Sequence, residues 1–171
     1  MKIQLILFSL LLSIIANAQN LKTFSATMLP DSLCYLSIKS GKAYTKDAAG
    51  EVKTTLDLGL FETKNDKSSI IEWYNLKPDN EKVPEALCGT KTKVAAIGFD
   101  REQFDKCKTA ADLKRMTSYI STNSFSHFAV VRNSNDYYQR CFIIEREDGK
   151  RGLIFMTATG GNAFKAEVKA E

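Results

Sequence analysis

The single histidine of the chain, His127, is the side chain best suited to proton transfer or metal binding near neutral pH. Any Ser–His or Cys–His relay would have to use it. In an alternating strand pattern His127 shares a face with Phe125, Ala129 and Val131, which favours a hydrogen-bonded structural histidine. Two chemical alternatives stay open, namely a haem or metal ligand and a catalytic base.

Two carboxylates, Asp57 and Glu72, lie inside segments with strand periodicity. Glycoside hydrolysis needs two carboxyl groups about 5 to 9 Å apart, so a small carboxylate-dependent hydrolase is one alternative function. Other catalytic signatures are missing from the sequence, which has no G-x-S-x-G nucleophile motif, no phosphate-binding glycine loop and no calcium-binding loop. The absence of these motifs favours a protein without enzymatic activity.

Aromatic residues occur as adjacent pairs in two predicted strands. Because successive side chains of a strand point to opposite faces, one member of each pair is a candidate for exposure. Exposed aromatic rings suit contact with a carbohydrate, with haem or with another protein. The alternative is that these rings pack the interior. The candidate ligand-contact residues are Trp73, Tyr74, Tyr137 and Tyr138.

The first 18 residues have the pattern of a secretion signal. A lysine precedes an almost wholly apolar run over residues 5–15, and Ala-Asn-Ala at 16–18 forms a small-x-small cleavage site. The apolar run is too short to cross a bilayer, which takes about 20 residues. We therefore expect a secreted or periplasmic protein with a signal peptide over 1–18 and a single domain over 19–171, with no membrane span after cleavage.

The cysteine count predicts a disulfide framework. An even number of cysteines in an exported chain indicates paired thiols, and no C-x-x-C motif suggests a redox or zinc site. Four cysteines allow three pairings. We favour a short loop closed by Cys88 and Cys107, together with a bond from Cys34 to Cys141 that joins an early strand to a late one.

Composition and charge narrow the class of protein. Hydrophobic residues make up 44% of the chain and charged residues 26%, as in an ordinary globular domain. The net charge of +4 is spread over dispersed lysines. Nucleic-acid-binding proteins concentrate basic residues on one face, so we expect no nucleic-acid partner.

The periodicity predicts a mainly β fold. Alternating segments dominate, Asp148-Gly149 marks a hairpin, and two capping-box patterns begin a helical insert around 100–121, at Asp100 and Thr109. We expect an antiparallel β-sandwich or open barrel with that insert. A turn is expected at 46–50 and a long loop at 77–90. The expected strands are 22–28, 33–39, 42–45, 54–61, 68–76, 93–99, 125–132, 137–147, 151–157 and 164–169.

The order of these segments supports a family resemblance. The stretch Leu36–Tyr44, then Leu56–Phe61, and later Tyr138–Ile154 resembles the exported β-sandwich proteins of Gram-negative anaerobes, which include bacterial haemophores and related surface proteins. The likeness covers residues 33–157 and rests on strand-and-turn patterns, which carry over a fold more safely than a function. It implies a Gram-negative periplasmic or secreted location.

The resemblance also implies haem as a candidate cofactor. Haemophore members of this group hold the haem iron through two His or Met side chains from different loops. Here the one histidine ligand would be His127, and a second ligand would come from Met28, Met116 or Met156.

Together these patterns predict a secreted or periplasmic, non-enzymatic binding domain whose partner is a protein or a glycan of the cell envelope. The alternatives are haemophore-like haem binding through His127 and a small hydrolase that uses Asp57 and Glu72.

Overall fold

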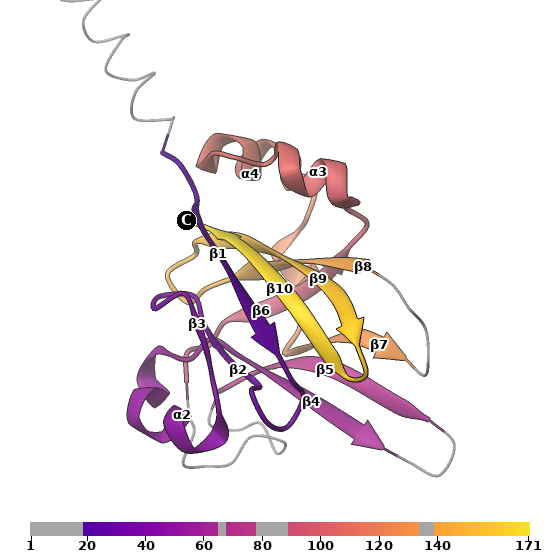
Figure 1. Ribbon diagram of the computed structural model, residues 1–171. Helices are drawn as coiled ribbons and strands as arrows, with labels where there is room; N and C mark the ends of the chain where they lie inside the picture. Colours follow the sequence, from indigo (N-terminus) through magenta and orange to yellow (C-terminus); the bar gives the residue numbers. More distant parts are fainter. Residues whose placement is uncertain (1–18, 65–67, 78–88, 134–138) are drawn as a thin grey trace, which may run out of the picture.

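Two antiparallel sheets of five strands each build the molecule, a β-sandwich (Figure 1). The computed structural model describes residues 19–64, 68–77, 89–133 and 139–171. The first sheet has the order β1 (Lys22–Met28), β10 (Ala163–Ala170), β9 (Arg151–Gly160), β8 (Gln139–Glu145) and β6 (Lys93–Ile97). The second has the order β3 (Lys42–Tyr44), β2 (Tyr35–Ser37), β4 (Leu58–Lys64), β5 (Ser69–Asn75) and β7 (Phe128–Asn133).

The main core lies between the two sheets, because alternate residues of both sheets point inward. Leu56, Leu58 and Leu60 are all buried there, as their spacing predicts. Strand β5 adds Trp73, which is 0% exposed. The first sheet contributes, among others, Phe142, Ile144, Ile154, Met156, Phe164 and Val168.

The two sheets also meet along their edges. At one side the backbone N–H of Val94 donates to the carbonyl of Ser126 (3.0 Å), and the N–H of Ser126 donates back to Val94 (2.9 Å). At the other side Lys22 Nζ donates to the backbone carbonyls of Ile38 and Lys39. Each of these two pairs of hydrogen bonds joins a strand of the first sheet to a segment next to a strand of the second sheet. The two sheets are therefore connected at both edges of the sandwich.

Helices cover the outer face of the first sheet, where α3 (Arg101–Lys106) and α4 (Ala110–Met116) lie together above the strands (Figure 1). Both predicted capping boxes are present, at Asp100 with Gln103 and at Thr109 with Asp112. A one-turn 3₁₀ helix, η3 (Thr122–Ser124), follows. The apolar residues between this layer and the sheet form a second core: Leu21, Phe99, Phe104, Cys107, Leu113, Ile120, Phe125, Cys141, Ile143, Leu153 and Phe155.

One predicted turn is instead a helix. Helix α2 (Lys46–Val52) continues into a 3₁₀ turn, η1 (Lys53–Thr55), before β4 begins at Leu58. The Thr45 hydroxyl accepts a hydrogen bond from the N–H of Ala48, and Ala49 is fully buried against the main core. Burial of one small side chain therefore stabilises a helix whose sequence, interrupted by Gly50, resembles a turn.

The predicted disulfide between Cys34 and Cys141 is wrong. Cys34 is buried in the main core, whereas Cys141 packs with Cys107 in the second core, on the opposite face of the first sheet. Side chains on opposite faces of a sheet cannot bring their Cβ atoms to the separation of about 4 Å that a disulfide requires. All three of these cysteines are free thiols in the structure. The predicted partner of Cys107, Cys88, lies outside the described residues.

Three further predictions concern residues that the structure does not describe: the signal peptide over 1–18, Tyr137 and Tyr138. Within the described ranges, no helix has the length and apolar character needed to cross a bilayer.

Candidate functional site

His127 lies immediately before β7, with an exposed side chain. Its Nδ1 is 3.0 Å from the side-chain Nδ2 of Asn75, a residue that is 1% exposed. Because an amide nitrogen only donates, Nδ1 of the neutral ring accepts this hydrogen bond and the ring proton is on Nε2. The backbone reinforces the contact, since the N–H of Asn75 donates to the carbonyl of His127 (2.8 Å).

The predicted position of His127 on the buried face of a strand is wrong. Ala129 and Val131 do point into the main core, but Phe125 belongs to the second core. The backbone of Ser126 pairs with Val94 of the first sheet, so the chain crosses between the sheets just before His127. Strand alternation across this crossing therefore does not hold.

A haem group does not fit His127 and its predicted partners. With the proton on Nε2, the outward nitrogen of the ring has no lone pair for iron while the Asn75 contact is made. Met28 and Met156 are 0% and 1% exposed inside the main core. Met116, the last residue of α4, packs against the second core. No predicted methionine therefore joins His127 in a ligand pair.

Asp57 is a buried carboxylate, 1% exposed, whose oxygens are taken up by hydrogen bonds. The N–H of Ile38 donates to Oδ2 (2.8 Å), and the hydroxyls of Thr90 and Thr92 donate to Oδ1 (3.1 and 2.9 Å). Arg146 Nε lies 3.9 Å from the same Oδ1. These partners lie after β2, before β6 and after β8, so Asp57 joins segments of both sheets at one end of the sandwich.

Glu72, the second predicted carboxylate, is on the outer face of the second sheet and accepts a hydrogen bond from the Tyr74 hydroxyl (2.7 Å). It is paired across the sheet with Phe61, which is four residues from Asp57 along the chain. At 3.3 Å per residue, the Cα atoms of Phe61 and Asp57 are about 13 Å apart. The structure does not bring the two carboxylates to the spacing of a glycosidase pair.

A row of aromatic rings crosses the outer face of the second sheet. Phe128 stacks on Tyr74, with ring centroids 5.9 Å apart and an interplanar angle of 24°. Tyr74 contacts Phe61 (6.0 Å), which contacts Tyr35 (5.8 Å). The Phe61 ring lies over Gly59, where an added Cβ would come within 2.5 Å of it. The absence of a side chain at Gly59 thus lets the row continue across the sheet.

The predicted pair Trp73-Tyr74 is divided between the two faces, as strand alternation requires. Trp73 is a core residue, which agrees with the alternative that these rings pack the interior. Tyr74 lies on the outer face but is only 8% exposed. The ring that reaches solvent is Phe128, which is 48% exposed. We call Phe128, Tyr74 and Glu72 the Phe128 surface.

Sequence reasoning did not select Phe128, although a signal for it exists. Ala129 and Val131 are inward-facing residues of β7. The same period of two places Phe128 and Val130 on the opposite, outer face. Phe128 and Val130 are therefore two apolar side chains on the outer face of β7. Such a pair is unusual on a strand face that is only solvated, so it indicates a contact surface.

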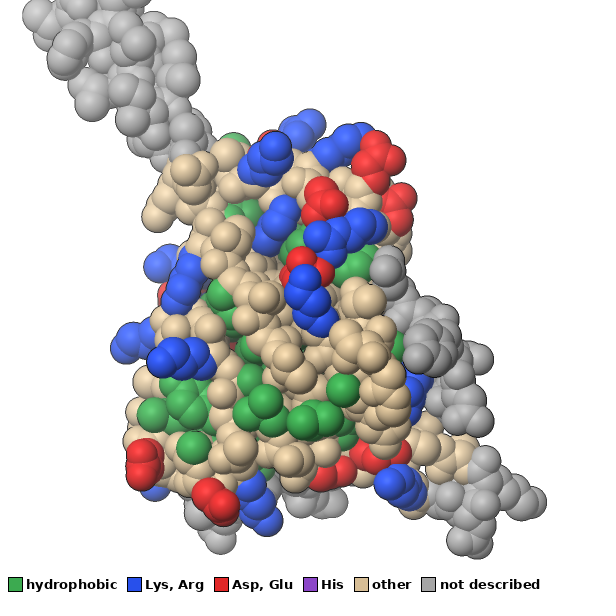
Figure 2. Space-filling view, in the orientation of Figure 1, with side chains coloured by type: hydrophobic (Ala, Val, Ile, Leu, Met, Phe, Trp, Pro, Cys, Tyr) green, Lys and Arg blue, Asp and Glu red, His purple; other side chains and the backbone are tan. Residues whose placement is uncertain are grey.

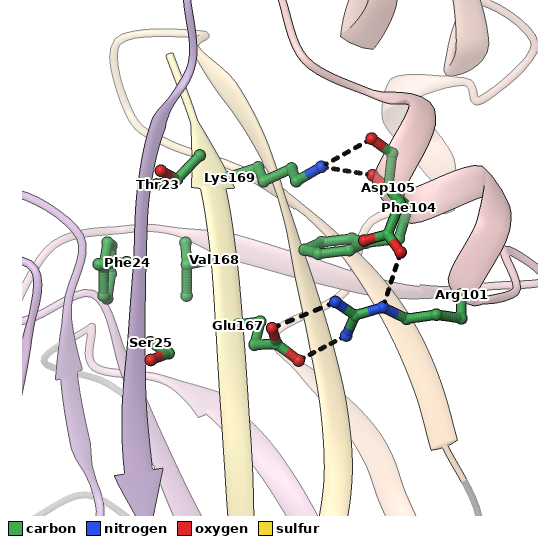
Figure 3. Close-up of a pocket in the computed structure, with 9 residues that line it drawn as sticks. All are labelled: Thr23, Phe24, Ser25, Arg101, Phe104, Asp105, Glu167, Val168 and Lys169. Carbon is green, nitrogen blue, oxygen red and sulfur yellow. Dashed lines mark hydrogen bonds and ion pairs between the residues drawn. The ribbon is translucent and has the colours of Figure 1, made fainter.

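A separate cleft of about 290 Å³ lies between α3 and strands β1 and β10 (Figure 3). Arg101 reaches across it and donates to both carboxylate oxygens of Glu167, while its Nε donates to Asp105 (3.0 Å). Lys169 Nζ donates to the carbonyls of Phe104 (2.7 Å) and Cys107 (2.8 Å) at the end of α3. We call these contacts the α3 clamp.

The charged groups of the α3 clamp bond to one another or to backbone carbonyls. Acidic and basic side chains alternate over this part of the surface (Figure 2). Arg101 is held by two carboxylates, and burial lowers the pKa of Lys169. A cleft whose cations already have partners is a poor site for an anionic ligand. Its role is to fix the helical layer on the first sheet.

Acid should loosen the α3 clamp. Hydrogen bonds from Arg101 lower the pKa of Glu167. A carboxyl with a lowered folded-state pKa stabilises the fold above its unfolded pKa of about 4.3, and this contribution is lost as pH falls through the folded pKa. We expect the protection of α3 amides against hydrogen exchange, corrected for the intrinsic exchange rate at each pH, to fall as pH drops below about 4.3 in the wild type, and to change less in Glu167→Gln. Equal pH dependence in both proteins would contradict the role of Glu167.

The three described thiols should be unreactive in the folded protein. Burial raises the pKa of Cys34 and Cys107 to about 11 and that of Cys141 to about 12. Thiolate, the reactive form, is then scarce at pH 8. We expect iodoacetamide to label none of the three in the native state and all three in denaturant without reductant, as read by peptide mass mapping. Native-state labelling, or a site still blocked after unfolding, would oppose this assignment.

Comparison with protein-family models, with curated proteins and with solved structures finds no match for this chain.

Proposed function

We propose that this chain is a secreted or periplasmic, non-enzymatic binding domain that recognises a glycan of the cell envelope through the Phe128 surface. The observation that carries the proposal is the Phe128 ring, half exposed at 48% and supported from behind by Tyr74. Isolated exposed apolar side chains are common. An exposed ring that stacks on Tyr74 at the end of a row of contacting aromatic rings is different, because these contacts restrict its orientation before a ligand arrives.

A sugar suits the chemistry of this surface. The face of an aromatic ring carries negative charge in its quadrupole, and the C–H groups on one side of a pyranose are weakly positive, so the two stack. Glu72 is 9% exposed and accepts the hydrogen bond of the Tyr74 hydroxyl, so it helps to hold Tyr74, the ring on which Phe128 stacks. An ordered ring also loses little entropy on binding.

Export is the second part of the proposal. It rests on the signal-peptide pattern over 1–18 and on the resemblance to exported β-sandwich proteins. An envelope location would place the domain among polysaccharides and glycosylated surface molecules. Haem carriage and carboxylate hydrolysis receive less support, because neither His127 with a methionine nor Asp57 with Glu72 comes together.

The test is binding of the protein, residues 19–171, to an array of bacterial and host polysaccharides. We expect saturable binding to at least one glycan, weakened about tenfold or more in Phe128→Ala, which corresponds to about 1.4 kcal/mol. Leu29→Ala is the matched control, because Leu29 is also exposed (37%) but belongs to the turn that follows β1. No bound glycan, or equal binding by Phe128→Ala, would refute the proposal.

A further inference from the structure

Strand β1 forms one edge of the first sheet, and the pairing register shows which of its backbone groups point outward (Figure 1). The N–H of Glu171 donates to the carbonyl of Arg151 (3.1 Å), so the odd-numbered residues of β10 direct their backbone groups to β9 and the even-numbered ones to β1. Because the register pairs Phe24 with Val168, the even-numbered residues of β1 bond to β10. The odd-numbered residues, which direct their backbone groups away from the sheet, form what we call the β1 window: Thr23, Ser25 and Thr27.

The β1 window is unpaired and symmetric. Among the residues that the structure describes, none bonds to its outward N–H or C=O groups. At each end, the next odd-numbered residue is already bonded. The N–H of Leu21 donates to the carbonyl of Lys108 (3.2 Å), and the N–H of Leu29 donates to the carbonyl of Leu33 (3.0 Å). Ser25 is therefore the centre of a window whose two ends are equivalent.

The β1 window also lacks the usual protection of a strand edge. Proteins commonly guard such edges with charged residues, prolines or bulges. Residues 23–27 have the sequence Thr-Phe-Ser-Ala-Thr, without a charge or a proline, and the three side chains of the window are exposed. The register between β1 and β10 is regular along the whole strand, so no bulge turns the edge away. An edge of this kind can pair with a further strand.

A second copy of β1 fits the window better than an unrelated strand. Two antiparallel copies related by a two-fold axis at Ser25 set Thr23 of each copy against Thr27 of the other. Every outward N–H and C=O of both windows then gains a partner. The pairing stops where Leu21 meets Leu29, and the N–H groups of both are already bonded. The equivalence of the two ends is the property that a symmetric partner uses.

The side chains of two copies are complementary in this register. On the outer face the hydroxyl side chains of the two windows meet, and Thr–Thr or Ser pairs across strands are favourable. On the inner face Phe24 of each copy lies against Ala26 of the other, so a large side chain meets a small one. The window carries no charge. The charged residues of β10 beside it are three strand spacings from those of the other copy, about 14 Å, which exceeds the screening length of about 10 Å in 0.1 M salt.

We infer that two copies of this chain pair through the β1 window and join their two five-stranded first sheets into one continuous sheet. The two-fold axis of an antiparallel strand pair is perpendicular to the sheet, so both copies keep the same face of the sandwich on the same side. The two Phe128 surfaces then face one side of the dimer, where they can bind a repetitive glycan together. This bivalent display rests on the proposed function, whereas the dimer itself does not depend on glycan binding.

Sedimentation equilibrium of the protein, residues 19–171, from about 1 μM to about 1 mM tests the dimer without any glycan. We expect a monomer–dimer equilibrium in the wild type. Ser25→Lys should raise the dissociation constant of the dimer at least about tenfold, because two lysines would face each other at its centre. The matched variant Ser25→Ala adds no charge and should keep the dissociation constant within about threefold of the wild type. Both variants should fold, since Ser25 is exposed.

Two further measurements keep the test decisive. Ser25→Glu alone should also dissociate the dimer, and an equimolar mixture of Ser25→Lys and Ser25→Glu should form it again, because opposite charges then meet at the axis. In the wild type, hydrogen exchange at the Ser25 amide should slow about tenfold or more from the lowest to the highest concentration. The inference is overturned if the wild type stays monomeric throughout, which would leave the edge to a different partner, if Ser25→Lys dimerises like the wild type, or if the mixture stays monomeric.

Discussion

Asp57→Ala should lower the free energy of unfolding by about 3–5 kcal/mol. The substitution leaves the buried N–H of Ile38 without its acceptor and removes the acceptor shared by Thr90 and Thr92, whose hydroxyls then have only each other (2.7 Å) among these partners. It also removes the carboxylate near Arg146, whose side chain is 23% exposed. Because these partners belong to different strands and connections, the loss should disturb one whole end of the sandwich.

Urea denaturation at neutral pH measures this effect. Glu51→Ala is the control, because Glu51 is exposed on α2 and should change stability by less than about 0.5 kcal/mol. Asp57→Asn should fall between the two, since its amide keeps one acceptor oxygen but loses the charge. If Asp57→Ala lowers the free energy of unfolding by less than about 1 kcal/mol, water has replaced the carboxylate. That result would contradict the role of Asp57 in joining the two sheets.

Trp73→Ala is expected to destabilise the protein by about 3–5 kcal/mol, the usual cost of removing a large aromatic side chain from a core. Trp73 is 0% exposed and packs between the sheets. Its indole Nε1–H has no hydrogen-bond partner among the described residues. Trp73→Phe should therefore cost much less, because it leaves a smaller cavity and removes a buried donor that has no partner.

Thermal unfolding followed by circular dichroism separates these outcomes, with Phe128→Ala alongside. That variant should keep a midpoint close to the wild type, because about half of its ring already faces solvent. The sequence analysis selected Trp73 as a candidate contact residue and did not select Phe128, whereas the structure buries Trp73 and exposes Phe128. A midpoint for Trp73→Ala within about 2 °C of wild type would contradict its place in the core.

Most strands were predictable because their residues alternate between a core and a solvated face. Strand β1 matches the predicted range 22–28, and Asp148-Gly149 forms the expected turn, with Gly149 at a φ of 79°. The capping boxes were also readable, since a cap depends on residues only three positions apart. These features share one property: local sequence decides them.

Features that depend on the packing of distant segments were not predictable. Alternation divides Trp73 from Tyr74 but does not say which of them faces the core. It also does not reveal that Cys34 and Cys141 lie on opposite faces of one sheet. The exposed position of His127 depends on the pairing of Val94 with Ser126, a contact between residues far apart in the chain.

The most direct test of the account is calorimetric titration of the protein, residues 19–171, with the glycan that binds best on the array, beside Phe128→Ala. The account predicts saturable one-site binding by the wild type. In the variant it predicts an affinity lower by at least about tenfold, with an unchanged melting temperature. Equal affinity in both proteins, or a loss of affinity that accompanies unfolding of the variant, would contradict the assignment of the Phe128 surface as the binding site.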